Sequence, residues 1–292
     1  MNKSIFWVML VGVVGLLSAC SSGLEDTSQR YIENENKVIQ YGKANNLTLT
    51  KEANSGTYYA VTTPNTSGRS PKETELVKVF YTYRKLDGTL LDSTTSVPLG
   101  FPYYTYNTIL NIPVALLKEG EKGVFIFPET SQYTEPTILS IELISTRNET
   151  EQIGEFVQSK FAGLNVNSTS TGLQYVITKS NSTGELVKAG QTVTVTYTGK
   201  LLFPTKKRDS NGFYIYNEQF DTGSFSFILG QGSTVAGFEE SVSKLKVGDK
   251  GNFVFPSSLG YSKTGSLDNS TGVYTVPPYS PLNFEIEVTA VK

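Results

Sequence analysis

The stretch FDTGSFSFILGQGSTVAGF, from Phe220 to Phe238, decides the fold of this chain of 292 residues. Phe225 and Phe227 are two residues apart, so both side chains point to the same face of a strand. The three glycines that follow allow tight turns with positive φ, which residues with a side chain rarely adopt. We therefore expect a strand and a turn that line a hydrophobic hollow.

The order of motifs around this stretch occurs twice in the chain. GEKGVFIFP at Gly120–Pro128 matches GDKGNFVFP at Gly248–Pro256. Four further pairs keep the same order: Gly56–Val61 with Gly172–Ile177, Val79–Thr82 with Val195–Thr198, Leu91–Ser93 with Phe220–Thr222, and Leu139–Leu143 with Phe284–Val288. Internal similarity of this kind indicates repeated structural units. The sequence therefore predicts two tandem domains, at residues 29–147 and 148–292.

Both copies alternate apolar and polar residues with period two, which is typical of antiparallel sheets with one buried face. In the first copy we expect strands at residues 57–61, 76–85, 89–93, 124–127 and 138–144. A helix is expected at Gly237–Gly248, where apolar residues recur at i, i+4 and i+7 and Gly248 would end it. Segments 29–44 and 149–163 predict one short helix before each copy. The fold class is therefore α+β.

The first residues have the pattern of a secretory signal peptide, predicted at 1–19. Lys3 precedes an apolar stretch that is too short for a spanning helix and ends in small residues. Leu17–Cys20 resembles the lipobox of bacterial lipoproteins, which implies cleavage before Cys20 and lipidation of its thiol. Residues 20–28 would then be a lipidated cysteine and a tether, holding the chain on the outer side of a bacterial membrane, by preference the outer membrane. An ordinary secretory signal with a chance cysteine is the alternative.

Composition excludes several classes of function. The net charge is −2, which argues against nucleic acid as a partner. The chain has no histidine and a single cysteine, which removes Ser-His-Asp and Cys-His catalysis, metal sites built from these residues, and any disulfide. We therefore expect no metal and no cofactor.

Eight motifs of the second copy point to one family. They are Gly190–Gly199, Phe220–Asp221, Phe225–Gly230, Val235–Glu239, Gly248–Lys250, Pro256–Tyr261, Val276–Pro278 and Leu282–Val288. In this order they make residues 172–292 resemble the FKBP-type peptidyl-prolyl cis–trans isomerases. That family folds as a curved antiparallel sheet wrapped around a short helix. The resemblance thus implies two tandem FKBP-like domains, the first one degenerate, each preceded by a short helix.

The resemblance also implies a prolyl pocket in the second copy. Its walls would be Tyr197, Phe220, Phe227, Val235, Val276 and Phe284, with Phe225 at the edge. Phe238 would form the floor, and Asp221 would be the polar group beside the pocket, hydrogen-bonded to a neighbour such as Tyr197. Tyr261 would present its hydroxyl to a substrate carbonyl. The partners implied are proline-containing polypeptides, with the macrolide ligands of the family as a further class.

The sequence departs from the family pattern at several points. The commonest floor residue of the family is Trp, where this chain has Phe238, and Ser262 replaces the Gly that usually follows the loop tyrosine. Residues 200–219 and 262–275 are insertions that we expect at the pocket rim, where they would change substrate choice or access.

The first copy lacks the loop tyrosine and the Val-Pro-Pro turn, and Tyr83 stands where the second copy has Gly199. We expect it to be catalytically silent and to act in spacing, docking or polypeptide binding. The function expected of the chain is prolyl isomerisation during the folding of exported proteins. A binding or chaperone module with little turnover, or a docking subunit of an envelope complex, are the alternatives.

Overall fold

The computed structural model describes residues 18–94, 96–105, 108–208 and 214–292, and divides the chain into two compact units. The smaller unit contains the residues up to Ala60 together with 82–92 and 124–140. The larger unit contains 61–81, 93–123 and 141–292. The border between the units runs through strands of the first sheet, not at the predicted boundary of the two repeats, so the division into domains 29–147 and 148–292 stays a prediction.

The first sheet has the strand order β1-β2-β6-β7-β3-β4, with β5 paired to β3, and the pairs β1–β2 and β3–β5 are antiparallel. Its strands are β1 (Thr50–Lys51), β2 (Tyr58–Thr63), β3 (Leu76–Lys85), β4 (Leu90–Ser93), β5 (Leu99–Pro102), β6 (Lys122–Phe127) and β7 (Thr137–Arg147). All five strands expected from the alternation are present, and β1 and β5 are additional ones. Gly88 has φ 91° in the turn between β3 and β4, a conformation that favours glycine. A short helix, α2 (Asn111–Leu116), buries Pro113 and Val114.

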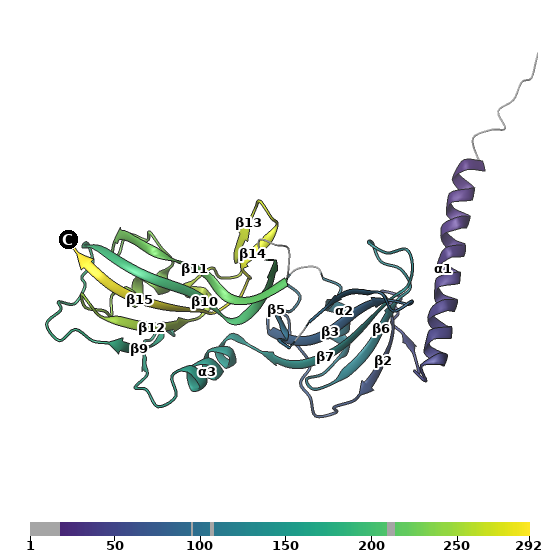
Figure 1. Cartoon of the computed structure of the whole chain (residues 1–292), viewed down its shortest axis with the longest axis horizontal. Helices are drawn as coiled ribbons and strands as arrows, with labels where there is room; N and C mark the ends of the chain where they lie inside the picture. The colour runs from purple at the N-terminus through teal and green to yellow at the C-terminus, as the bar shows by residue number, and fades with distance from the viewer. Residues whose placement is uncertain (1–17, 95, 106–107, 209–213) are drawn as a thin grey trace, which may run out of the picture. The chain divides into compact units, whose positions relative to one another are not determined.

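The second sheet lies in the larger unit and has the order β11-β10-β15-β12-β9-β8, seen as side-by-side arrows in Figure 1. Its strands are β8 (Asn167–Ser168), β9 (Gln174–Lys179), β10 (Thr192–Arg208), β11 (Tyr214–Ile228), β12 (Lys250–Phe255) and β15 (Leu282–Val291). β10 and β11 stay paired as far as Arg208 and Tyr214, so the insertion 200–219 prolongs this hairpin. The insertion 262–275 contains a second, separate hairpin of β13 (Ser266–Asp268) and β14 (Val273–Val276), after the 3-10 turn η1 (Ser257–Leu259).

The core of the second sheet is built from the alternating apolar positions, which all face one side. The buried cluster includes Val193, Val195, Phe253, Phe255, Phe284, Ile286 and Val288, together with Phe238 and Val242 from the helix α4. This helix covers Ala236–Val242, so the predicted helix 237–248 was too long. After Val242 the backbone continues in tighter turns, in which the amides of Lys244 and Leu245 donate to the carbonyls of Ser241 and Val242, each at 3.1 Å.

The helices that precede the repeats differ in length. α3 (Glu149–Lys160) begins with a capping box, in which the Asn148 side chain and the Glu151 side chain each accept the other residue's backbone amide. α1 spans Ser18–Ala44 and therefore includes residues 20–28, which were expected to be a tether. The predicted signal peptide lies almost entirely outside the described residues. Among the described helices, none combines the length and the apolar character that crossing a membrane requires.

Candidate functional site

An aromatic cavity of about 330 Å³ opens in the larger unit beside the second sheet. It is lined by Tyr197, Asp221, Phe225, Ser233, Thr234, Val235, Phe238, Tyr261 and Phe284. These residues come from β10, β11, the loop before α4, α4 itself, the segment after η1, and β15. Segments far apart in sequence thus converge on one apolar hollow, which we call the aromatic cavity.

The paired strands β10 and β11 bring together the polar residues of the aromatic cavity, Tyr197 and Asp221. Tyr197 pairs with Gly223, and Gly199 pairs with Asp221 in the neighbouring strand. A Cβ atom on Gly199 would come within 2.7 Å of the Phe220 ring and 2.8 Å of the Phe284 ring. Glycine is therefore required at position 199, because no side chain fits between these two rings.

Phe238 forms the floor of the aromatic cavity and is held by other rings. Its side chain is 3% exposed, and its ring meets the rings of Tyr197 and Phe284 edge to face, with centroids 5.5 and 5.2 Å apart. Phe225 stacks on it at 5.8 Å. Edge-to-face and offset-stacked contacts are the arrangements that aromatic pairs prefer. The floor is thus rigid and apolar.

The polar group of the cavity is a tyrosine–carboxylate pair. The Tyr197 hydroxyl donates a hydrogen bond to Asp221 Oδ2 at 2.6 Å, and Asp221 Oδ1 accepts from the Thr222 amide at 2.8 Å. The pKa of Tyr197 is raised to about 12, chiefly by burial and further by the hydrogen bond to Asp221 and the negative charge of that residue. The phenol therefore stays neutral at any physiological pH.

Tyr261 offers the cavity a hydrogen-bond donor. Its hydroxyl has no hydrogen-bond partner among the residues that the structure describes, while its ring lies 6.5 Å from the Phe220 ring in edge-to-face geometry. Burial, followed by the negative charge of Asp221, raises the pKa of Tyr261. A neutral hydroxyl at the cavity wall can donate to a carbonyl oxygen of a bound peptide.

The loop before α4 supplies two lining residues that the sequence motifs do not predict, Ser233 and Thr234. The Glu239 carboxylate accepts hydrogen bonds from the amides of Gly230 and Thr234, at 2.9 and 3.4 Å. Glu240, beside it, instead accepts from the Thr171 hydroxyl. The sequence does contain a signal for this contact. Glu239 is an acid in the first turn of a helix, directly after a glycine-rich loop whose backbone amides need hydrogen-bond acceptors.

Three residues expected in the pocket walls do not line the cavity. Phe227 and Val276 are 6% and 1% exposed and belong to the core beneath it. Phe220 is partly buried behind the lining, where its ring packs edge to face on Phe284 at 5.6 Å. The lining also contains no residue of 262–275 and no described residue of 200–219.

Comparisons with known proteins agree on one family. The family whose sequence model matches is described as FKBP-type peptidyl-prolyl cis-trans isomerase, and the match covers residues 184–289. A probable FKBP-type peptidyl-prolyl cis-trans isomerase of Haemophilus influenzae is 32% identical over 149 residues, which are 50% of this chain and 54% of that protein. The match thus spans about half of that relative's length.

Two further similarities come from a short relative and from a solved structure. The crystal structure of FkpA from Escherichia coli is 30% identical, with a TM-score of 0.36, over 50% of this chain and 59% of that chain. FK506-binding protein 1B of Neurospora crassa is 32% identical over 110 residues, which are 38% of this chain and 90% of that protein. Because a relative at this identity is covered over nine-tenths of its length, the chain belongs to the family of FKBP-type peptidyl-prolyl cis-trans isomerases.

Proposed function

We propose that the chain catalyses the cis–trans isomerisation of Xaa-Pro bonds in polypeptides and that the aromatic cavity is the site. The observation that carries the proposal is the cavity itself, an apolar hollow of about 330 Å³ with a phenylalanine floor and a neutral tyrosine at its wall. A proline ring is a small apolar group, so it suits a hollow of this size and character.

The chemistry requires no nucleophile and no group with a pKa near neutrality. Rotation about a peptide bond must overcome the loss of amide resonance, a barrier of about 18–20 kcal/mol. A twisted imide has less charge separation than a planar one, so an apolar environment with little water stabilises it relative to the planar ground state. A chain without histidine can therefore perform this reaction.

Individual residues then have separate roles. Phe238, Phe225 and Phe284 surround the proline ring and exclude water. Tyr261 donates its free hydroxyl to a carbonyl next to the proline, which fixes the chain while the bond turns. Asp221 is a positioning residue, since it orients the Tyr197 hydroxyl at the cavity wall.

The purified chain should accelerate the cis-to-trans conversion of a short Xaa-Pro peptide, measured by a protease-coupled assay or by NMR exchange. Tyr197→Ala should remove most of the acceleration, because it opens the wall and deletes the hydroxyl. An uncatalysed rate at micromolar protein would reject the isomerase and leave a binding module of the same fold.

We also propose that the protein acts outside the cytoplasm of a bacterium, held on a membrane through a lipid on Cys20, and that its clients are exported proteins. The support is the lipobox-like sequence and its single cysteine, together with matches to bacterial relatives. Cys20→Ser should release the protein into the soluble fraction of cells. A mutant that still sediments with membranes would rule out lipidation as the anchor.

A further inference from the structure

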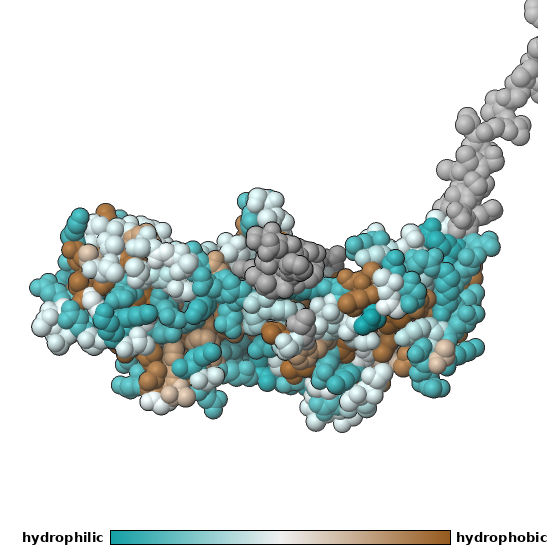
Figure 2. Space-filling view, viewed as in Figure 1, coloured by the Kyte–Doolittle hydropathy of each residue, from teal (hydrophilic) through white to brown (hydrophobic). Residues whose placement is uncertain are grey.

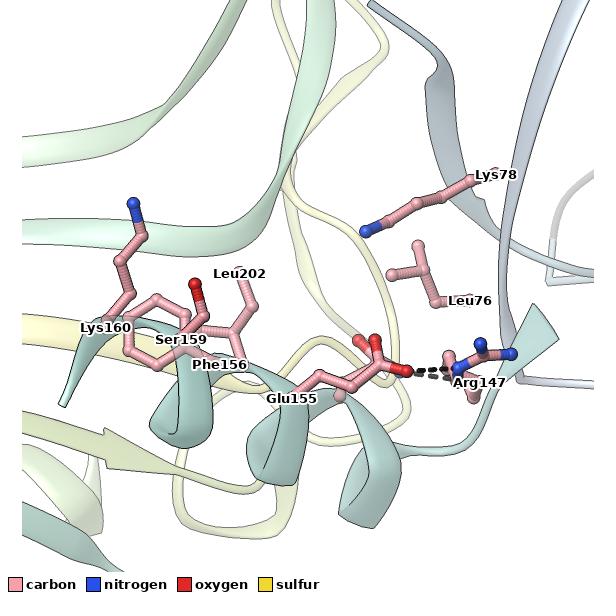
Figure 3. Close-up of a pocket in the computed structure, with 9 residues that line it drawn as sticks. Leu76, Lys78, Arg147, Glu155, Phe156, Ser159, Lys160 and Leu202 are labelled. Carbon is pink, nitrogen blue, oxygen red and sulfur yellow. Dashed lines mark hydrogen bonds and ion pairs between the residues drawn. The ribbon is translucent and has the colours of Figure 1, made fainter. Parts of the chain in front are cut away.

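A second cavity lies in the larger unit between α3 and the strands β3 and β10 (Figure 3). Its volume is about 190 Å³, and it shares no lining residue with the aromatic cavity. Pockets for drug-sized ligands usually measure about 300–1,000 Å³, so this space suits a smaller group. The proposed isomerisation makes no use of it.

Gln152 gives this cavity a buried acceptor without a partner. Its side chain is 5% exposed, and its Nε2 atom donates to the Arg147 carbonyl oxygen at 3.1 Å, which fixes the orientation of the amide. The other end of the amide, Oε1, is buried and has no hydrogen-bond partner among the described residues. Buried polar atoms in native proteins are nearly always satisfied, so a ligand with an N–H or O–H donor would complete this site.

The charge of the lining is positive. Lys78 and Lys160 line the cavity, and neither makes a hydrogen bond or ion pair with another described residue. Arg147 and the one acid of the lining, Glu155, are also present, and the Arg147 guanidinium pairs with this Glu155 and with Glu119 at 2.9 Å, which leaves the two lysines as the cations without a partner among the described residues. A surplus of cations around a small concave site attracts an anion.

Lysines at a surface often need no ligand. Lys160 lies in the last turn of α3, where a cation suits the helix dipole in any case. A solvated surface does not explain the buried Oε1 atom of Gln152, which has no hydrogen-bond partner among the described residues. The two observations together favour a ligand that carries both a negative charge and a hydrogen-bond donor.

The remaining wall is apolar. Leu76, Phe156 and Leu202 line the cavity, and Leu76 is 4% exposed. Figure 3 shows Phe156 on α3 next to Leu202, and Figure 2 shows hydrophobic residues gathered around α3. The ligand must therefore also present an apolar group.

We propose that this cavity binds the C-terminal residue of a polypeptide whose last side chain is apolar. The terminal carboxylate pairs with the lysines, the backbone N–H donates to Gln152 Oε1, and the side chain packs against Phe156 and Leu202. A fatty acid lacks the donor, an internal segment lacks the charge, and a free amino acid brings an ammonium that the lysines repel. Capture of a terminal carboxylate is a recurring mode of peptide recognition.

The test uses the full chain and a fluorescent, proline-free peptide ending in Gly-Ser-Leu, either as the free acid or as the C-terminal amide. Fluorescence anisotropy should show that the free acid binds at least about tenfold more tightly than the amide. Binding of the free acid should weaken as salt is raised, because the lysines are exposed to screening. Equal affinities for acid and amide, or no binding of the acid at millimolar protein, would overturn the proposal.

Matched variants locate the site. Lys78→Met should weaken binding of the free acid about tenfold, and Lys160→Met gives a second variant should the first not fold. Lys188→Met, an exposed lysine that lines neither cavity, should change nothing. Tyr197→Phe should leave this binding intact, so a failure of the proposed isomerase would not affect the outcome. Identical binding by Lys78→Met, Lys160→Met and Lys188→Met would reject this cavity as the site.

Discussion

Two strands that share a sequence pattern, β3 and β10, differ in what contacts the tyrosine of that pattern. At the end of the pattern in β10, the Tyr197 hydroxyl donates to Asp221 at 2.6 Å and its ring lines an open cavity. At the matching position in β3, Lys206 Nζ donates to the Tyr81 hydroxyl oxygen and to the Ser93 carbonyl oxygen, each at 3.2 Å. The same ammonium lies 5.5 Å from the centre of the Tyr81 ring, and Tyr81 is 8% exposed.

The repeat therefore preserves the strand, but only the tyrosine of the second copy lines an open cavity. Lys206 belongs to the insertion 200–219, and Phe203 of the same insertion is 1% exposed. A Cβ atom on Gly100 would come within 2.8 Å of the Phe203 ring. Within the larger unit, the start of this insertion therefore packs on β5 and Tyr81, away from the aromatic cavity. The described part of the insertion therefore packs beside Tyr81 and does not cover the side of Tyr197 that lines the aromatic cavity.

Replacement of the floor residue Phe238 should have the largest effect of the variants considered. Phe238→Ala leaves a hole among four aromatic rings and should lower the free energy of unfolding by about 3–5 kcal/mol. Isomerase activity per folded molecule should fall on the order of a hundredfold, since the proline would no longer be held in place. Urea unfolding and the peptide assay measure the two effects. Phe253→Leu, a core change outside the cavity, should cost stability and leave activity per folded molecule unchanged.

Neutralising the carboxylate tests the Tyr197 pair. Asp221→Asn removes a charged acceptor, and kcat/KM should fall about tenfold. Asp92→Asn, the matching residue of the first copy, should leave kcat/KM unaltered. Equal losses in the two variants would contradict a difference between the copies.

The Asp221→Asn variant should also differ from the native chain in how its stability depends on pH. Because the pKa of Tyr197 is raised to about 12, its stabilising contribution is full below the unfolded value near 10 and is lost as pH rises through about 12. Loss of the Asp221 charge lowers that pKa, so the decline in stability, which starts near pH 10 in both proteins, should end first in Asp221→Asn and be smaller in total. Unfolding curves between pH 9 and pH 12 check this order.

Weakening the loop should have a smaller effect. Glu239→Gln keeps the shape of the side chain but loses the charge that holds the Gly230 and Thr234 amides, so KM should rise about fivefold with little change in kcat. Glu240→Gln is the control, because its carboxylate binds Thr171 instead. A fall in kcat without any change in KM would assign Glu239 a role in the reaction itself.

The smallest expected effect is at the first copy. Lys206→Met removes the ammonium over Tyr81 and should cost about 1 kcal/mol of stability, with isomerase activity unchanged. Thermal unfolding measures the loss. Altered activity in this variant would mean that the hairpin influences the aromatic cavity after all.

Much of the fold could be predicted because alternation reports which strand face is buried. Val193, Val195 and Ile286 alternate with polar residues, and each is fully buried. The pairing of β5 with β3 was not predictable, since Leu99–Pro102 is too short to alternate. The end of α4 at Val242 was not predicted, because the apolar spacing of Phe238, Val242 and Leu245 continues past it.

The candidate site was predictable to a similar degree. Family motifs predict a pocket around Tyr197, Phe238 and Tyr261, and the structure places these three residues on one cavity. Residues that line the cavity differ from residues that pack beneath it in how deeply they are buried. Sequence spacing does not reveal that difference. Phe225 and Phe227 are alike in sequence, yet Phe225 lines the cavity while Phe227 lies beneath it.

The most direct test of the central claim is an NMR titration of the isotope-labelled chain with an Ala-Pro peptide. We expect chemical-shift changes confined to residues around Tyr197 and Phe238, and exchange cross-peaks between the cis and trans peptide that appear only with protein present. Shift changes centred on Tyr81, or a peptide that binds at Tyr197 without exchange, would contradict it.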